Sequence, residues 1–231
     1  MMSDILPNQC TLKSDVTLNG VGLHTGKNVT LTFKPAPANT GYVFKRIDLE
    51  GEPCIVADAN YVTNTQRGTN LEKDDVTIQT SEHVLAALVG LEVDNCILEL
   101  NASEPPIMDG SSKFFVEAIE KAGIVTQDAV REEYVVTEII NYIDEETGSE
   151  ITILPSDTYQ VTTMVDFGTK VLGTQNASIK NISEFKSEIS DSRTFSFLHE
   201  IEMLLDHGLI KGGDLNNAIV YVDKQLSEKT M

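Results

Sequence analysis

The sequence has no tryptophan, few aromatic residues and only three cysteines. Aromatic side chains make up 6% of the 231 residues, so aliphatic side chains must form most of the core. Cys10, Cys54 and Cys96 are odd in number, and no two are spaced as CxxC. This pattern indicates neither a disulfide framework nor a cysteine-rich zinc knot. We expect each cysteine to be a small, buried apolar residue.

Positive charge is scarce as well. Lysine and arginine total 17 against 36 aspartates and glutamates, which gives a net charge of −19. Such a surface repels phosphate, so we expect no nucleic-acid partner. No apolar run approaches the roughly 18 residues of a membrane span, and Met1 to Gln9 lack the segments of a signal peptide. We expect a cytoplasmic protein.

The hydrophobic pattern divides the chain into two halves. Hydrophobic residues make up 41% of the sequence, which is ordinary for globular proteins. The polar stretch Thr126 to Glu133 predicts a boundary between a first domain over residues 1–126 and a second over 127–231. A helical period predicts helices at Thr80–Leu91 and Ser111–Gly123. The other predicted elements are strands at Asn28–Pro35, Gly41–Asp48, Asp75–Gln79, Val93–Asn101, Tyr134–Ile143, Glu150–Leu154 and Gln160–Phe167, a helical stretch near Ile182–Ile189, and a βαβ unit made of Arg193–Phe197, Leu198–Gly208 and Ala218–Val222.

Two of the four histidines stand in positions that suit a functional site. His83 follows Glu82 in the first turn of a predicted helix. An imidazole that binds a metal beside a carboxylate that accepts a proton is the layout of a metal hydrolase. Lone polar residues at a helix end also serve as caps, so a structural role is open too. His24 lies in a glycine-rich turn, Gly20 to Lys27, which is either a tight hairpin or the lining of a site near an anion.

Four segments resemble one enzyme family in order along the chain. They are Gly20 to Gly41 (GVGLHTGKNVTLTFKPAPANTG), Ser81 to Asn95 (SEHVLAALVGLEVDN), Glu104 to Ser112 (EPPIMDGSS) and Ser192 to Asp223. Together they resemble the UDP-3-O-acyl-N-acetylglucosamine deacetylases of lipid A biosynthesis. These zinc-dependent amidohydrolases remove the N-acetyl group of UDP-3-O-(3-hydroxyacyl)-N-acetylglucosamine, the committed step toward the lipid A of the Gram-negative outer membrane.

The resemblance implies a fold and a set of catalytic groups. The implied fold is α+β, with two two-layer α/β sandwich domains that are like domain 2 of ribosomal protein S5. The helices would pack between the sheets, and the second domain would be incomplete. The implied cofactor is Zn²⁺ in the cleft between the domains, with His83 as a ligand, Glu82 as the general base and Thr194 as a stabiliser of the oxyanion.

The resemblance also implies how the substrate is held. The βαβ unit would form a hydrophobic passage for the acyl chain, although the same residues would suit an ordinary core. Arg67 and Gly68 would border the active site, and Phe167 would lie near the nucleotide. The implied passage residues are Phe195, Ile201, Ile210, Gly213 and Val220.

One departure from the family lies near the end of the sequence. The family's other two zinc ligands, a histidine and an aspartate on one helix, follow the βαβ unit, but no histidine follows His207. We therefore expect a chain truncated before these ligands, and 231 residues that alone are inactive and poorly stable. A non-catalytic homologue that acts as an interaction module is the alternative, although the retained Glu82, His83 and Thr194 favour the enzyme. Some family members are fused to a dehydratase domain, which is a candidate partner here. Because the implied substrate carries a lipid chain, the resemblance also implies peripheral membrane contact at most.

Overall fold

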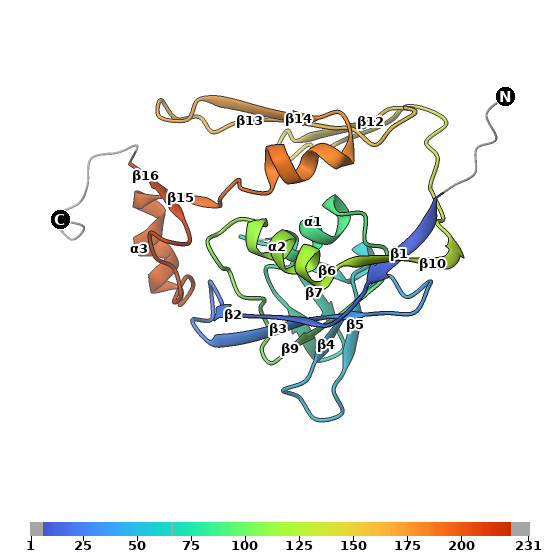
Figure 1. Cartoon of the computed structure of the whole chain (residues 1–231). Coiled ribbons are helices and arrows are strands. Elements are labelled where there is room, and N and C mark those ends of the chain that lie inside the picture. Colours follow the sequence, from blue (N-terminus) through green and yellow to red (C-terminus); the bar gives the residue numbers. More distant parts are fainter. Residues whose placement is uncertain (1–6, 66, 223–231) are drawn as a thin grey trace.

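A five-stranded sheet underlies the N-terminal half of the protein in the computed structural model, which describes residues 7–65 and 67–222 (Figure 1). Side chains of the predicted strand Asn28–Pro35 alternate as expected, and Val29, Leu31 and Phe33 are buried. Cys96 is buried in the same sheet, but Cys54 is exposed, so the expectation that every cysteine is buried is wrong. The strands run in the order β2 (Val16–Val21), β3 (Asn28–Pro35), β9 (Cys96–Leu100), β4 (Tyr42–Arg46) and β5 (Cys54–Val56), with β4 and β9 parallel and the other neighbours antiparallel.

Helices α1 (Glu82–Gly90) and α2 (Lys113–Ala122) cover one face of this sheet and confirm the two predicted helices. Phe115 of α2 packs on Phe33 of β3, with ring centroids 6.3 Å apart. Helix α2 is followed by its C-cap residue Gly123, whose φ of +76° is a conformation that glycine adopts without a steric penalty. No helix in the described part of the chain has the length and apolar character needed to cross a membrane.

A three-stranded sheet leads the chain from β5 to helix α1. It contains β6 (Val62–Asn64), β7 (Asn70–Lys73) and β8 (Val76–Ile78), after a 3-10 turn, η1 (Ala59–Tyr61). Leu71 and Ile78 are paired across this sheet, and both are buried in the main core. The small sheet is therefore anchored to the core, and it holds the segment that enters α1.

Strands β1 (Asn8–Leu12) and β10 (Ile124–Val130) form an antiparallel pair that closes the N-terminal half. The boundary expected at residue 126 falls inside β10, so the chain up to residue 130 pairs with the first half. Polar side chains of β10 form hydrogen bonds with the first half. Gln127 donates a hydrogen bond to the carbonyl of Ala36 and accepts one from Asn95, both at 2.8 Å.

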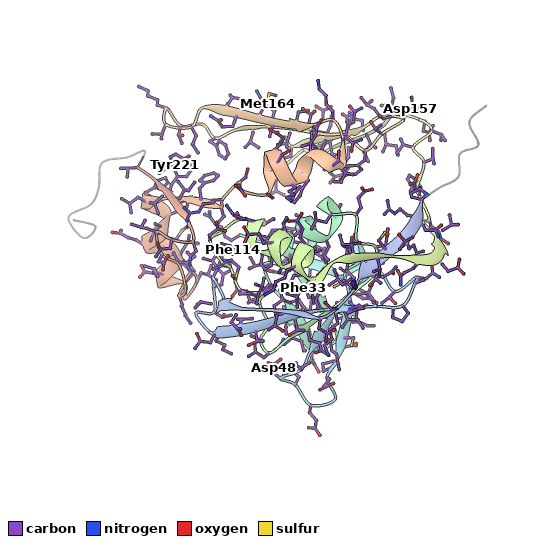
Figure 2. All side chains as sticks on the ribbon, viewed as in Figure 1. Phe33, Asp48, Phe114, Asp157, Met164 and Tyr221 are labelled. Carbon is purple, nitrogen blue, oxygen red and sulfur yellow. The ribbon has the colours of Figure 1, made fainter. Side chains whose placement is uncertain are left out.

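Two exposed hairpins form the first part of the C-terminal half: β11 (Ile140–Ile143) with β12 (Glu150–Ile153), and β13 (Val161–Asp166) with β14 (Thr174–Ile179). Figure 1 shows them as an outer layer, with the helices between them and the five-stranded sheet. Met164 lies on this layer and is 74% exposed (Figure 2). The strand predicted from Tyr134 is wrong before residue 140, because residues 134–139 form no strand. The fold is thus a mixed α/β fold with several small sheets.

A short helical segment joins the outer layer to the helices below it. It consists of a 3-10 turn, η2 (Ile182–Glu184), and a π-helical turn, η3 (Phe185–Ile189). The ring of Phe185 is buried against Gly90 at the end of α1, where an added Cβ would lie 2.0 Å from Cδ1 of Phe185. Lys186 also pairs with Glu120 of α2 at 2.5 Å. The helical character predicted near Ile182 is confirmed, in a tighter and then a wider form than an α-helix.

The predicted βαβ unit is confirmed at the end of the described chain. Strand β15 (Phe195–Phe197), helix α3 (Leu198–Asp206) and strand β16 (Ile219–Tyr221) follow one another, and the two strands are parallel. The unit rests on the glycine-rich turn between β2 and β3, because the Gly212 N–H donates to the carbonyl of Leu23 at 3.0 Å.

Candidate active site

The chain enters helix α1 through a constrained turn. Thr80 has a φ of +51°, which is unfavourable for a β-branched residue. Its N–H donates to Oδ1 of Asn70 at 3.2 Å, and its hydroxyl donates to the carboxylate of Glu104 at 3.0 Å. Ser81 takes the N-cap position of α1, but its hydroxyl donates to the carbonyl of Thr69 and does not cap the helix. These bonds fix the direction of the first helical residues.

Glu82 and His83 are the first two residues of α1. Oε2 of the half-buried Glu82 accepts a hydrogen bond from the Thr69 N–H at 2.8 Å. Burial lowers the pKa of His83 below its ordinary value, and the negative charges of Glu82 and Asp109 partly oppose this shift. The imidazole is therefore neutral at pH 7, which is the form that binds metals.

The loop before α2 connects this helix end to Thr194. The hydroxyl of Ser112 donates to the carbonyl of His83 at 2.9 Å. Two residues earlier in the same loop, the carbonyl of Gly110 accepts from the Thr194 N–H at 2.7 Å. Thr194 therefore lies against the loop that also contacts His83.

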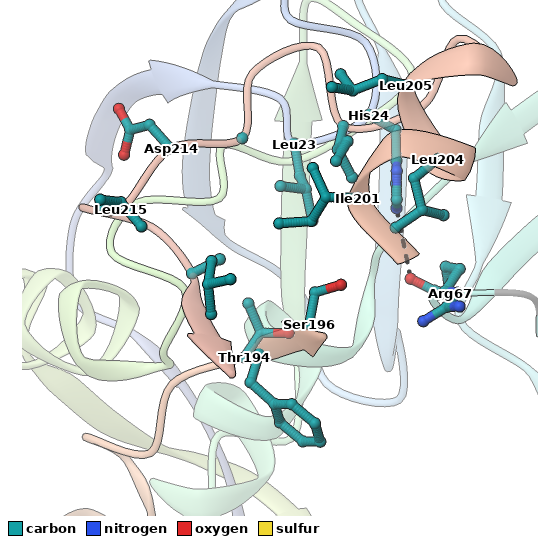
Figure 3. A pocket seen from close by; sticks show the side chains of 15 residues that line it. Leu23, His24, Arg67, Thr194, Ser196, Ile201, Leu204, Leu205, Asp214 and Leu215 are labelled. Atoms are coloured by element: carbon teal, nitrogen blue, oxygen red, sulfur yellow. Dashed lines mark hydrogen bonds between the residues drawn. The ribbon is translucent and has the colours of Figure 1, made fainter. Parts of the chain in front are cut away.

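An apolar cavity of about 220 Å³ lies beside Thr194, between the βαβ unit and the glycine-rich turn (Figure 3). An engineered apolar cavity of about 150 Å³ binds benzene, so this cavity has room for part of a narrow apolar ligand. Its polar edge includes His24, Arg67 and Ser196. The aliphatic residues that line it are Leu23, Ile201, Leu204, Leu205, Ile210, Leu215, Ala218 and Val220.

Arg67 closes one side of this cavity through an ion pair with helix α3. Its guanidinium donates to both carboxylate oxygens of Glu200, at 2.8 and 3.3 Å. This hydrogen bonding raises the pKa of Arg67 and lowers the pKa of Glu200. The carbonyl of Arg67 lies 3.4 Å from Nε2 of His24, as the dashed line in Figure 3 shows. Three separate segments thus meet at Arg67.

Comparison with known protein families identifies the group to which this arrangement belongs. The family model of UDP-3-O-acyl N-acetylglycosamine deacetylase matches residues 9–231. The chain belongs to this deacetylase family.

Individual members of the deacetylase family differ in length from this chain. The chain is 46% identical over 222 residues to a protein of Bacteroides thetaiotaomicron named bifunctional enzyme LpxC/FabZ, and the match covers 96% of this chain and 48% of that protein. It is 44% identical over 216 residues to a UDP-3-O-acyl-N-acetylglucosamine deacetylase of Pseudomonas entomophila, covering 92% of this chain and 70% of that protein. The chain therefore spans about half the length of its bifunctional relative.

The structure gathers most of the site residues that the resemblance implied. Phe167 does not line the cavity, but its ring packs edge-on against Phe195 at 5.2 Å. Gly68 lies beside Glu82 instead, where an added Cβ would be 3.4 Å from Oε1 of Glu82. The roles of these residues stay predictions. The predicted residues that line the cavity are Arg67, Thr194, Phe195, Ile201, Ile210, Gly213 and Val220.

Some residues that line the cavity were not predicted from the sequence. Leu204 and Leu205 follow Ile201 at helical spacing, and this spacing was the signal that could have found them. Leu215 lies in a loop and carries no such signal. The turn that carries His24 is a tight hairpin, as one of its two readings predicted, because the Gly26 N–H donates to the carbonyl of Gly22. His24 also lines the apolar cavity, and the site near an anion stays a prediction.

The described residues contain no complete metal site. Within residues 7–65 and 67–222, no group of three or more histidine, cysteine, aspartate or glutamate side chains is placed to hold a metal ion. A catalytic zinc usually takes three protein ligands. A complete zinc site therefore does not fit these residues, and His83 is the one predicted ligand among them.

Proposed function

We propose that this chain supplies the general base, one metal ligand and the acyl-chain cavity of an amidohydrolase. Its substrate would be UDP-3-O-(3-hydroxyacyl)-N-acetylglucosamine, and its products acetate and the free amine. One observation carries the proposal: the end of α1 that bears Glu82 and His83 is joined through the Gly110–Ser112 loop to Thr194, which lines an apolar cavity. The family and the names of its members support it.

The side chains suit the steps of amide hydrolysis. Glu82 would take a proton from water as the water oxygen attacks the acetamide carbonyl carbon. The hydroxyl of Thr194 would donate a hydrogen bond to the oxyanion that develops. The C–N bond then breaks, and the amine nitrogen takes the proton that Glu82 removed from water, so that acetate and the free amine leave. The Thr69 N–H holds the carboxylate of Glu82 in a fixed orientation for this task.

We assign Zn²⁺ to this reaction, with His83 as its ligand from this chain. The other ligands would have to come from residues other than those described, since no group of three possible ligands lies among them. The 231 residues alone are accordingly expected to be inactive. We also propose that the two hairpins belong to the sheet of a second sandwich domain, which lies over α1 and α2. The protein would work in the cytoplasm. A dehydratase function would accompany it, as the names of the bifunctional relatives suggest.

Acetate release from the substrate tests this function. The 231-residue chain is assayed beside the protein encoded by the gene read past codon 231, each with zinc content measured. We expect acetate from the longer protein only, with losses of about 10²–10⁴-fold for Glu82→Gln and about 10²–10³-fold for Thr194→Val. Glu99→Gln, on strand β9, where the carboxylate pairs with Lys34 and Lys45 and lines no part of the cavity, is the matched control. A 231-residue chain that bound one zinc and released acetate would show that the ligand assignment is wrong.

The absence of a three-ligand group among the described residues favours one other candidate, a non-catalytic interaction module of the same fold. In that case, substitution of Glu82 or His83 would change no measurable activity, and no acetate would be released by either protein.

A further inference from the structure

Glu104 is a buried carboxylate that lies outside the groups with roles above. Its side chain is 0% exposed. Oε1 accepts hydrogen bonds from the His24 N–H and the Thr80 hydroxyl, each at 3.0 Å, and Oε2 accepts one from the Thr25 N–H at 3.0 Å. Burial of a carboxylate is unfavourable unless such bonds replace water. Its position therefore depends on the two segments that donate to it.

The first segment, the glycine-rich turn, is built around the carboxylate. Consecutive N–H groups of His24 and Thr25 point at it, as in backbone sites for anions. At Gly22, an added Cβ would lie 2.6 Å from Oε2 of Glu104 and 2.4 Å from the hydroxyl oxygen of Thr25. Only glycine therefore fits at this position while the carboxylate stays in place.

The glycine-rich turn forms one wall of the cavity and makes hydrogen bonds to the βαβ unit. Leu23 and His24 line the cavity. The N–H groups of Gly212 and Lys211 donate to the carbonyls of Leu23 and His24, at 3.0 and 3.4 Å. A shift of the turn would therefore move the cavity wall and the unit docked on it together.

The second segment leads directly to the candidate catalytic residues. Thr80 precedes Glu82 by two residues and is held at a φ of +51°. The hydrogen bond from its hydroxyl to Glu104 helps to maintain this conformation. Glu104 thus contacts both the cavity wall and the entry to α1.

We propose that Glu104 is a positioning residue whose carboxylate aligns the apolar cavity with the Glu82–His83 end of α1. It acts through the glycine-rich turn and Thr80, and it contacts no reacting atom. The role in catalysis rests on the proposed function, whereas the effect on the cavity does not.

Binding of cis-parinaric acid, a fluorescent fatty acid, to the 231-residue chain tests the effect on the cavity. In Glu104→Gln the amide NH₂ would face backbone N–H donors, so the turn must shift. We expect the dissociation constant to rise about tenfold while Glu99→Gln leaves it unchanged. Equal affinity in both variants would overturn the proposal.

A pair of variants at Thr80 keeps the test decisive if Glu104→Gln does not fold. Thr80→Val removes one hydrogen bond to Glu104 and keeps the shape of the side chain, and Thr80→Ser keeps the hydroxyl. We expect weaker binding of the probe in Thr80→Val and recovery in Thr80→Ser. The same loss in both variants would assign the effect to packing and overturn the proposal.

Selectivity for the acyl chain in the longer protein tests the alignment with Glu82. Parent and Thr80→Val are compared by kcat/KM on substrates with and without the 3-O-acyl chain. We expect the preference for the acylated substrate to fall about tenfold, since small misplacements can lower rates by about 10²-fold. An equal loss on both substrates would overturn the proposal. If no protein released acetate, the proposed function would fail, and the probe-binding result would still decide the role of Glu104.

Discussion

His83 illustrates how the surroundings of one side chain set its protonation. Burial lowers its pKa below the ordinary value of 6.5, against the opposing effect of Glu82 and Asp109. Between the folded and the unfolded pKa, the unfolded chain binds more protons than the folded one. The free energy of unfolding therefore rises with pH across that window. The contribution of His83 to stability is lost as the pH falls below about 6.5, the pKa of the unfolded chain.

Substitution of His83 should remove this contribution. Urea unfolding is measured from about pH 5 to pH 8 with a chelator present, in the parent and in His83→Gln. We expect the parent to lose more stability than the variant as the pH falls through the window below 6.5. Identical slopes in both proteins would contradict a lowered pKa at His83.

Single residues differ in how well a sequence can predict them. Glu82, His83 and Thr194 were predicted because they stand in segments that resemble a known family. Glu104 lies in one of those segments too, but its partners are mainly backbone N–H groups, which no pattern of side chains reveals. Arg67 was predicted at the site, whereas its ion pair with Glu200 joins positions 133 residues apart and needed the fold.

Gly90 at the end of helix α1 should be intolerant of any side chain. Alanine normally stabilises a helix by about 0.5–1 kcal/mol relative to glycine. Here its Cβ would lie 2.0 Å from the Phe185 ring, and overpacking of this kind costs about 1–3 kcal/mol. We expect Gly90→Ala to lower the free energy of unfolding in urea.

Two further variants show whether Phe185 is the cause. Val89→Ala, at a side chain that is 41% exposed on the same helix, should change stability by less than about 0.5 kcal/mol. Phe185→Leu combined with Gly90→Ala should recover part of the loss. An additive loss in the double variant would mean that the two residues are not coupled.

Elements with a strong local signal were predicted, and elements made by distant pairing were not. Helices α1 and α2 and the βαβ unit have apolar periods that identify them within a short window. Strand β10 overlaps the polar stretch that predicts a domain boundary, and its polar sequence gives no sign of a strand. Its partner β1 lies more than 100 residues earlier in the chain. The side chain of Gln127 makes its hydrogen bonds to Ala36 and Asn95, 91 and 32 residues earlier, which a local pattern does not reveal.

The outer hairpins leave apolar side chains uncovered over much of one layer of the protein. Tyr142 is 63% exposed and Met164 74%, and unpaired strand edges with apolar side chains promote association. We expect the 231-residue chain to self-associate at micromolar concentration in sedimentation velocity. The double variant Tyr142→Glu/Met164→Glu should be monomeric.

Ile47→Glu, at a turn of the first half that is 40% exposed, is the control and should associate like the parent. Association that persisted in the double variant would place the contact elsewhere. The sequence predicted strands in this region, but not their arrangement as two separate hairpins, because the alternation within a strand does not specify its neighbour.

The pairing of β1 with β10 has a mechanical consequence. Asn8 lies opposite Val130, and Leu12 lies opposite Ile124. A pulling force applied at residues 8 and 130 would load the hydrogen bonds of this pair one after another from the open end, as a zipper opens. Strands β1 and β10 would therefore separate under low tension. The five-stranded sheet and the helices, including the end of α1 with Glu82 and His83, would stay folded.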